Sequence, residues 1–253
     1  MLDMDGTVFL EDQLLPGVNQ FLESCKTKGI KVVYLTNNST KDRKTYVNKL
    51  KSLGLDVSIH DIFTSGEATI RYVLQEKLNA NVFLLGNELL EGEFIESGVN
   101  LVRERNKQVD FVVLGFDTTL TYEKIWIACD YIREGIPFIA THPDLNCPLK
   151  NDNYMPDTGS MIKMFEASTN VSPLIIGKPN VQLVEILSRN LGIDKHAICM
   201  VGDRLYTDIK MAVDADITSV LVLSGETKEE DLHESSVKPT HVVKHLGELE
   251  KFI

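Results

Sequence analysis

The chain has 253 residues, of which 43% are hydrophobic and 25% charged, and its formal net charge is −11. This composition is ordinary for a globular protein with one large or two modest domains. The negative charge argues against a general binder of nucleic acid or of anionic membranes, because both need a positive field. No apolar run approaches the roughly 20 residues of a membrane helix, and no basic-then-apolar signal segment opens the chain.

The four cysteines show no Cys-x-x-Cys pairing and have no histidine at metal-ligand spacing, so a zinc site is not expected. Three of them, Cys25, Cys129 and Cys199, lie within apolar patterns that are typical of small core residues. This use of cysteine favours a reducing, cytoplasmic location.

The first predicted strand ends in the sequence DMDGT at positions 3–7. Side chains alternate along an extended chain, so Asp3 and Asp5 start on the same side. Two carboxylates at one strand end can divide a reaction, one attacking and the other moving protons. Asp-Gly is also a common turn, so the pentapeptide alone is equally consistent with a solvent-exposed turn between a strand and a loop. Only Met1 and Leu2 precede Asp3, so we expect either a very short strand or a native chain that starts upstream of Met1.

Strand and helix patterns then alternate, which predicts a mostly parallel α/β sheet. In chain order we expect a helix whose apolar face includes Val18 and Cys25 and which stops at Gly29, a buried strand at 31–35, and helices at about 40–53 and from near Gly66 on. A second series predicts strands at 82–85, 111–114 and 137–140, and helices at 122–133 and about 159–167.

A third series predicts strands at 174–176, 197–201, 220–223 and 242–243. Within it, Thr207 is expected to cap a short helix that runs through Val213. In the second series, four glutamates are expected to form a solvated acidic surface: Glu88, Glu91, Glu93 and Glu96.

Polar residues follow four of the predicted strands, and open parallel sheets bind ligands at the carboxyl ends of their strands. Singly, each residue has an ordinary explanation as a turn residue, a helix cap, a helix-start acid or a solvated lysine. Acids, a hydroxyl and a lysine at four such ends point jointly to one site. The residues are Asp3 with Asp5, Thr36 with Asn37, Lys178, and Asp203 with Asp208.

The motifs DMDGT, LTNNST, IIGKP and VGDRLYTDI resemble the four motifs of the haloacid-dehalogenase-like (HAD) phosphohydrolases. The long insert between the second and third motifs, and the GDRLYTDI form of the fourth, resemble the NagD-type, 4-nitrophenylphosphatase-like branch, subfamily IIA. The resemblance covers nearly the whole chain. It implies a Rossmann-like doubly wound parallel sheet core at 1–78 and 173–253, with an inserted α/β cap domain of the C2 type at 79–172.

The resemblance also implies a phosphoric monoester hydrolase (EC 3.1.3.-) that works through an aspartyl-phosphate. Asp3 would be the nucleophile, and Asp5 the general acid and then the general base. The implied cofactor is Mg²⁺, which suits an all-oxygen site, with Asp3, the backbone carbonyl of Asp5 and Asp203 as ligands. Asp208 would support Lys178 or the metal-bound waters.

Four further residues would hold the phosphate oxygens by the same resemblance: Thr36, Asn37, Asn38 and Lys178. Two metal-binding aspartates and a phosphate dianion bring about four negative charges, of which Mg²⁺ and Lys178 offset about three. Without a metal, the acids would repel one another and the substrate.

In the implied cap, we expect the loop at 142–148 to reach the leaving group of the substrate. His142, Pro143 and Asp144 are therefore candidate specificity residues, although a surface turn is an equally open reading of His142. A closed cap would exclude water and place selectivity outside the catalytic core. Caps of related proteins often pair, so a homodimer through the cap is one expectation, although the chain shows no clear interface stripe.

The expected substrate is a small phosphorylated metabolite such as a sugar phosphate, a nucleoside monophosphate or pyridoxal phosphate, and the sequence singles out none. Haloacid dehalogenation also uses an aspartate nucleophile, but halide departure does not need the acid/base Asp5. A phosphate-accepting regulatory domain would be about half as long and would lack the insert. A mutase is less favoured, because no feature of the chain demands recapture of an intermediate.

Overall fold

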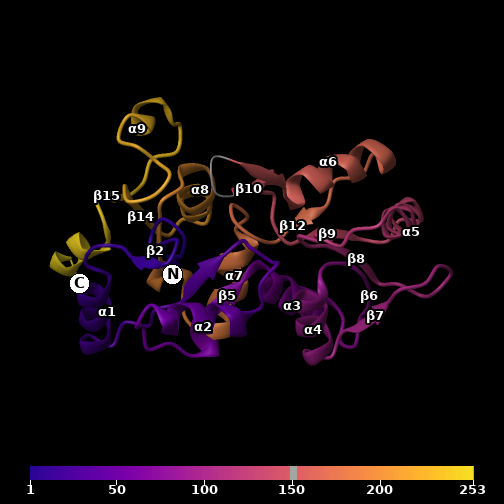
Figure 1. The fold of residues 1–253 in the computed structure, drawn as a ribbon, viewed down its shortest axis with the longest axis horizontal. Helices are drawn as coiled ribbons and strands as arrows, with labels where there is room; N and C mark the ends of the chain where they lie inside the picture. Colours follow the sequence, from indigo (N-terminus) through magenta and orange to yellow (C-terminus); the bar gives the residue numbers. More distant parts are fainter. Residues whose placement is uncertain (149–152, 253) are drawn as a thin grey trace. The chain divides into compact units, whose positions relative to one another are not determined.

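The computed structural model describes residues 1–148 and 153–252. The chain divides into two compact units (Figure 1). Unit 1 comprises residues 1–36, 43–63 and 178–253, and unit 2 comprises residues 37–42 and 64–177. Unit 2 is therefore larger than the predicted cap at 79–172, and those predicted boundaries stay a prediction.

Unit 1 is built on a six-stranded sheet with the order β15-β14-β13-β1-β4-β5. The pairings of β1 with β13 and β4, and of β14 with β13 and β15, are parallel. Strands from both ends of the chain therefore lie side by side, with β1 between β13 and β4. The strands are β1 (Leu2–Asp3), β4 (Tyr34–Thr36), β5 (Ile62–Thr64), β13 (Cys199–Gly202), β14 (Thr218–Val222) and β15 (His241–Val243).

Helices and a small hairpin accompany this sheet. The helices are α1 (Val18–Thr27), α2 (Arg43–Ser52), α7 (Gln182–Leu191), α8 (Lys210–Asp214) and α9 (Asp231–Glu234), and the hairpin pairs β2 (Phe9–Leu10) with β3 (Gln13–Leu14). Burial of apolar side chains between the helices and the sheet is the main stabilising term. The core of unit 1 includes Leu2, Met4, Phe9, Phe21, Tyr46, Leu50, Val201 and Val222.

Unit 2 contains a five-stranded parallel sheet with the order β12-β9-β8-β6-β7. Helices α5 and α6 run along one side of it, and α3 and α4 along the other (Figure 1). The strands are β6 (Asn81–Leu85), β7 (Asn100–Val102), β8 (Phe111–Leu114), β9 (Phe138–Ala140) and β12 (Leu174–Ile175). The helices are α3 (Ser65–Glu76), α4 (Glu88–Glu96), α5 (Tyr122–Arg133) and α6 (Thr158–Thr169), and an antiparallel hairpin joins β10 (Asn146–Pro148) to β11 (Tyr154–Pro156).

The α/β class and the parallel sheets predicted from the sequence are confirmed. Two local expectations are wrong for single residues. In helix α4, Glu88 and Glu96 are exposed as expected, but Glu93 is buried, because the apolar Leu90 and Phe94 turn that face inward. Thr207 does not cap a helix, because a π-helical turn at Leu205–Ile209 precedes α8 and brings Ile209 to the capping position.

Within the described residues, none of the helices combines the length and the apolar character that a membrane crossing requires.

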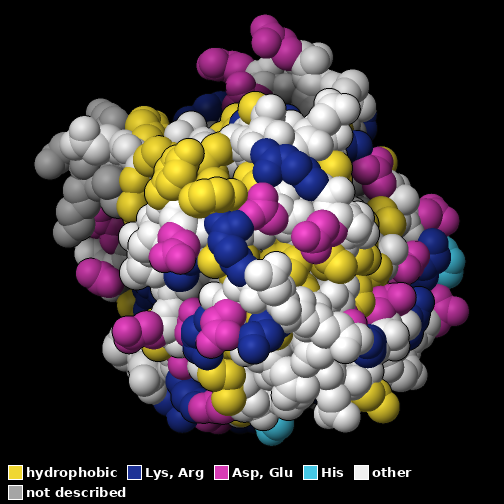
Figure 2. Space-filling view, turned by 90° about the vertical axis from the view of Figure 1, so that its right-hand side faces the viewer, with side chains coloured by type: hydrophobic (Ala, Val, Ile, Leu, Met, Phe, Trp, Pro, Cys, Tyr) yellow, Lys and Arg dark blue, Asp and Glu magenta, His cyan; other side chains and the backbone are white. Residues whose placement is uncertain are grey.

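Figure 2 shows hydrophobic side chains gathered in two areas of one face, among charged side chains of both signs. On α5, Tyr122 is 81% and Trp126 56% exposed. Arg105 lies over the Trp126 ring at 4.2 Å from its centroid, which is close enough for a cation–π interaction.

Candidate active site

The register of the unit 1 sheet brings three of the predicted strand ends together. Asp3, the last residue of β1, pairs with Leu35 of β4, so Thr36 lies one position beyond it on the neighbouring strand. On the other side, Leu2 pairs with Val201 of β13, and Asp203 follows two residues later. The carboxyl ends of adjacent parallel strands thus carry Asp3, Thr36 and Asp203 to one edge of the sheet.

Three buried carboxylates form a cluster at this edge. Oxygen atoms of Asp3, Asp203 and Asp208 all lie within 4.8 Å of one another. Asp208 comes from the π-helical turn after β13, and the backbone N–H of Arg204 donates to its Oδ2 at 3.1 Å. Gly202 permits this approach, because a Cβ there would lie 2.4 Å from the Cβ of Asp208.

Lys178 supplies the positive charge inside the cluster. Its ammonium forms ion pairs with Asp3 and, at 2.7 Å, with Asp208, and its side chain is 4% exposed. Burial by itself would lower the pKa of Lys178, but the carboxylates of Asp208 and Asp3 outweigh burial and raise that pKa. Lys178 therefore stays protonated in the neutral pH range.

Two of the carboxylates are held in an unfavourable environment. Burial raises the pKa of Asp3 well above its ordinary value, although Lys178 opposes the shift. Burial, followed by repulsion from Asp208, raises the pKa of Asp203 to about 6. Without a further cation, the cluster favours protonation of these groups, because removal from water destabilises the charged form.

The loop after β14 holds Asp203 in place and was missed by the sequence-based prediction. The backbone N–H of Glu226 donates to Asp203 Oδ2 at 2.7 Å, and Ser224 Oγ donates to the Gly6 carbonyl at 2.8 Å. The backbone approaches closely at Gly225, where a Cβ would lie 2.0 Å from Asp203 Oδ2. The sequence Ser-Gly-Glu-Thr directly after the strand at 220–223 was the signal, a fifth polar strand end.

The donor set fits a divalent cation. Among the described residues, Asp203 Oδ1 is buried and has no hydrogen-bond partner. Three carboxylates face one ammonium group, so the cluster carries an excess of negative charge. Closely spaced carboxylate oxygens are the ligands that Mg²⁺ prefers, so Asp3 and Asp203 are suited to hold it, beside the Asp208–Lys178 ion pair.

Asp5 differs from the other acids of this edge. It is exposed, it forms a backbone bridge with Phe9, and its carboxylate lies outside the buried cluster. Gly6 follows in a left-handed conformation with a φ of 82°, which turns the chain sharply after Asp5. The roles predicted for Asp5 stay predictions.

The remaining predicted residues belong to unit 2. Asn37 is buried, and its Nδ2 donates to Asp144 Oδ2 at 3.1 Å. Asn38 Oδ1 accepts from the backbone N–H of Thr40 at 2.9 Å and from its hydroxyl at 2.7 Å, which is an Asx-type turn. These bonds give the segment after Thr36 a defined conformation.

His142 lies inside unit 2 and makes hydrogen bonds with both ring nitrogens. Nδ1 is 2.9 Å from Thr141 Oγ1, and Nε2 is 2.9 Å from Asp157 Oδ1. The His142 ring is fully buried, whereas Pro143 and Asp144 are half-buried. The surface-turn reading of His142 is therefore wrong, and a specificity role for residues 142–144 stays a prediction.

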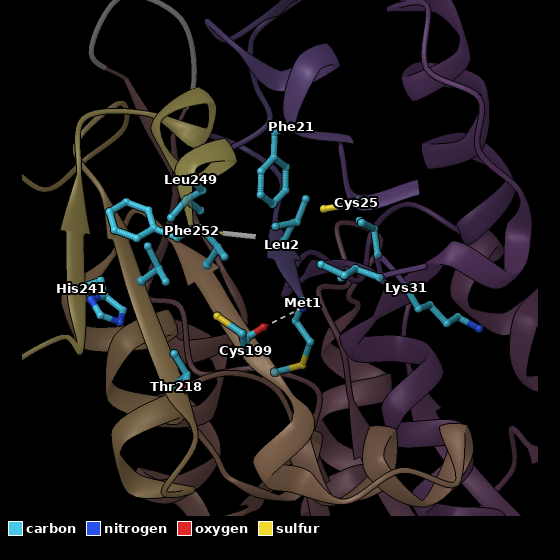
Figure 3. A pocket seen from close by; sticks show the side chains of 14 residues that line it. Met1, Leu2, Phe21, Cys25, Lys31, Cys199, Thr218, His241, Leu249 and Phe252 are labelled. Carbon is cyan, nitrogen blue, oxygen red and sulfur yellow. Dashed lines mark hydrogen bonds between the residues drawn. The ribbon is translucent and has the colours of Figure 1, made fainter. Parts of the chain in front are cut away.

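An apolar cavity of about 240 Å³ lies at the opposite edge of the unit 1 sheet (Figure 3). Its walls come from the amino ends of the strands, from α1 and from the segment at 249–252, and include Leu2, Phe21, Cys199 and Phe252. None of the clustered acids lines it. The cavity is therefore separate from the candidate active site.

Two family models match the chain, one toward each end of the sequence. One described as haloacid dehalogenase-like hydrolase matches residues 1–100, and one described as HAD-hydrolase-like matches residues 175–249. Among curated proteins, an acid sugar phosphatase of Staphylococcus aureus is 35% identical over 248 residues, covering 98% of this chain and 95% of that protein.

Solved structures give the same result. A 4-nitrophenylphosphatase from Thermotoga maritima is 48% identical with a TM-score of 0.92, covering 99% of this chain and 95% of that one. A p-nitrophenyl phosphatase from Archaeoglobus fulgidus is 28% identical with a TM-score of 0.93, covering 100% and 98% of the two chains. The likeness therefore extends over both units.

The raised pKa of Asp203 predicts a pH-dependent effect on stability in the metal-free protein. Between its ordinary value of 3.8 and about 6, the folded state binds more protons than the unfolded state. The free energy of unfolding therefore loses this contribution as pH rises through that window. We expect Asp203→Asn to match the wild type near pH 4 and to exceed it by up to about 3 kcal/mol above pH 6.

Urea unfolding in EDTA from pH 4 to 7.5 measures this difference. The matched control is Asp12→Asn, which changes an exposed aspartate of the same unit. A difference between Asp203→Asn and the wild type that does not change with pH would contradict the prediction.

Proposed function

The chain belongs to the haloacid-dehalogenase-like hydrolases and is a phosphatase that hydrolyses phosphomonoesters, and we propose from this that its substrates are small sugar phosphates. We also propose that its cofactor is Mg²⁺. The observation that carries this proposal is the buried cluster of Asp3, Asp203 and Asp208 around Lys178. The sugar phosphate class is supported by the curated relative named acid sugar phosphatase. Both the cofactor and the substrate class are tested below.

In the proposed reaction, a carboxylate oxygen of Asp3 attacks phosphorus as the bond to the ester oxygen breaks. Asp5 gives its proton to the departing alkoxide, then takes a proton from the water that attacks the aspartyl-phosphate. That second attack releases inorganic phosphate and restores both carboxyl groups.

The neighbouring residues make this chemistry favourable. Lys178, held between Asp3 and Asp208, places a fixed positive charge beside the nucleophile and the phosphoryl oxygens. Mg²⁺ held by Asp3 and Asp203 would supply further positive charge to the phosphoryl group. The Glu226 N–H and the close approach of Gly225 keep Asp203 oriented toward the cluster.

A dehalogenase is the weaker candidate. It would need an aspartate nucleophile but no second carboxyl group to protonate a leaving oxygen, whereas Asp5 follows Asp3 by two residues. A cytoplasmic location, contact of the loop at 142–148 with the leaving group, and a homodimer through the cap at 79–172 remain proposals. The exposed Tyr122 and Trp126 on α5 are the observation that supports an association face.

Removal of the nucleophile tests the mechanism. We expect Asp3→Asn to lower kcat for 4-nitrophenyl phosphate by at least about a thousandfold, because the amide is a far weaker nucleophile in nearly the same shape. Steady-state kinetics with MgCl₂ measures the loss, and Asp12→Asn is the control. Turnover near the wild-type rate would exclude Asp3 as the nucleophile.

Asp5→Asn tests proton transfer separately from binding. We expect kcat to fall by about a hundredfold or more, while the inhibition constant for inorganic phosphate stays within about threefold of the wild-type value. The reason is that Asp5 lies outside the buried charge cluster. An unchanged kcat, or equal losses of turnover and phosphate binding, would be incompatible with an acid/base role.

Metal dependence and substrate class are tested in one panel. Sugar phosphates, nucleoside monophosphates, pyridoxal phosphate and a haloacid are each assayed with MgCl₂ and then with excess EDTA. We expect hydrolysis of the phosphate esters, fastest for sugar phosphates, to be lost in EDTA and restored by added Mg²⁺. Full activity in EDTA would refute the cofactor assignment, and halide release would favour the dehalogenase.

A further inference from the structure

The segment that continues directly from Thr36 is held by unit 2. Residues 37–42 belong to that unit, and several of its side chains fix their positions. Ser65 Oγ donates to the Asn37 carbonyl, Asp144 accepts from Asn37 Nδ2 at 3.1 Å, and Asn87 Nδ2 donates to the Thr40 carbonyl at 2.8 Å. The conformation of this segment therefore depends on unit 2.

Ser39, in the same segment, starts a buried chain of hydrogen bonds that ends at Asp157. The backbone N–H of Phe116 is 3.0 Å from Ser39 Oγ, which is 3.2 Å from Thr141 Oγ1. Thr141 Oγ1 is 2.9 Å from His142 Nδ1, and His142 Nε2 is 2.9 Å from Asp157 Oδ1. Ser39, Thr141 and His142 are each at most 2% exposed.

One assignment of donors and acceptors satisfies every bond in this chain. With His142 in the neutral tautomer that donates from Nε2 to Asp157, Nδ1 accepts. Thr141 therefore donates to His142 and accepts from Ser39. Ser39 in turn accepts from the N–H of Phe116, which can only donate. Each hydroxyl then donates once and accepts once, so the chain is fully satisfied and defines one arrangement.

The same cluster also fixes the residue that directly precedes Lys178. The Gly177 N–H donates to the Thr141 carbonyl at 2.8 Å. A Cβ on Gly177 would lie 2.5 Å from that carbonyl oxygen and 2.7 Å from Asn37 Oδ1. The residue after Thr36 and the residue before Lys178 therefore meet beside Thr141 and His142.

From this arrangement we propose that the chain Ser39–Thr141–His142–Asp157 positions two phosphate-binding residues, Thr36 and Lys178, through their sequence neighbours Asn37 and Gly177. This inference rests on the proposed function, in which both residues hold the phosphoryl group. Thr141 and His142 are positioning residues, since they act through the backbone of their neighbours. Loss of the chain weakens phosphate binding, while Asp3, at the end of β1, and Asp203, held by the Glu226 N–H, keep contacts that do not involve the chain.

Thr141→Val tests the proposal, because it removes the hydroxyl from the middle of the chain with almost no change of shape. Thr141→Ser restores the hydroxyl and serves as the rescue. Thr169→Val is the matched control: its hydroxyl also makes two hydrogen bonds in unit 2, to the Phe165 carbonyl at 2.8 Å and from the Val171 N–H at 3.2 Å, at the end of α6.

The primary readout is the Kd of inorganic phosphate in MgCl₂, measured by isothermal titration calorimetry on the full chain. We expect Thr141→Val to raise this Kd, and the KM for 4-nitrophenyl phosphate, by about fivefold to twentyfold. We expect kcat and the half-saturating Mg²⁺ concentration to stay within about twofold. Thr141→Ser and Thr169→Val should both stay within about twofold of the wild type for phosphate binding.

Equal phosphate affinity in Thr141→Val and Thr169→Val would overturn the proposal. So would parallel losses of phosphate binding, Mg²⁺ binding and kcat, since these indicate a general loss of structure. If Thr141→Val does not fold, as judged by circular dichroism, Ser39→Ala takes its place with the same expected outcome. A wild type that binds phosphate without hydrolysing the ester would refute the proposed function alone, because the Kd comparison still decides this inference.

Discussion

Three buried carboxylates share one buried ammonium group at the carboxyl edge of the unit 1 sheet, and the rest of the site depends on this imbalance of charge. Lys178 pairs with two of the three acids, whereas Asp203 accepts from the backbone N–H of Glu226. Repulsion from Asp208 on Asp203 is opposed by the charges of Arg204 and Lys178. Burial of such a cluster is unfavourable unless a further cation enters it. A divalent ion and the groups that bind phosphate would therefore meet at this one edge of the sheet.

The residues of the candidate site and the residues that hold their neighbours belong to different units, and the chain crosses between the units more than once. The groups placed at the reacting phosphorus belong to unit 1, but the chain enters unit 2 directly after Thr36 and returns from it directly before Lys178. Hydrogen bonds within unit 2 hold both of those neighbouring residues. Selectivity and phosphate binding can thus respond to changes in unit 2 while the metal ligands stay in place.

The alternating pattern of apolar runs predicted the parallel sheets, and the polar residues after each run predicted Asp3, Lys178, Asp203 and Asp208, because parallel strands bring their carboxyl ends to one edge. The sequence pattern did not predict helix α4, because acidic residues outnumber the few apolar residues of its buried face. The chain from Ser39 to Asp157 was out of reach of the sequence, because its direction and closure depend on contacts between residues up to 102 positions apart.

The location of a bound divalent ion tests the central claim most directly. Crystals grown with Mn²⁺ in place of Mg²⁺ reveal the ion by its anomalous scattering. We predict one strong anomalous peak per chain, about 2 to 2.4 Å from carboxylate oxygens of both Asp3 and Asp203. An ordered wild-type site with no peak there, or with an ion that one of these two carboxylates does not contact, would contradict the account.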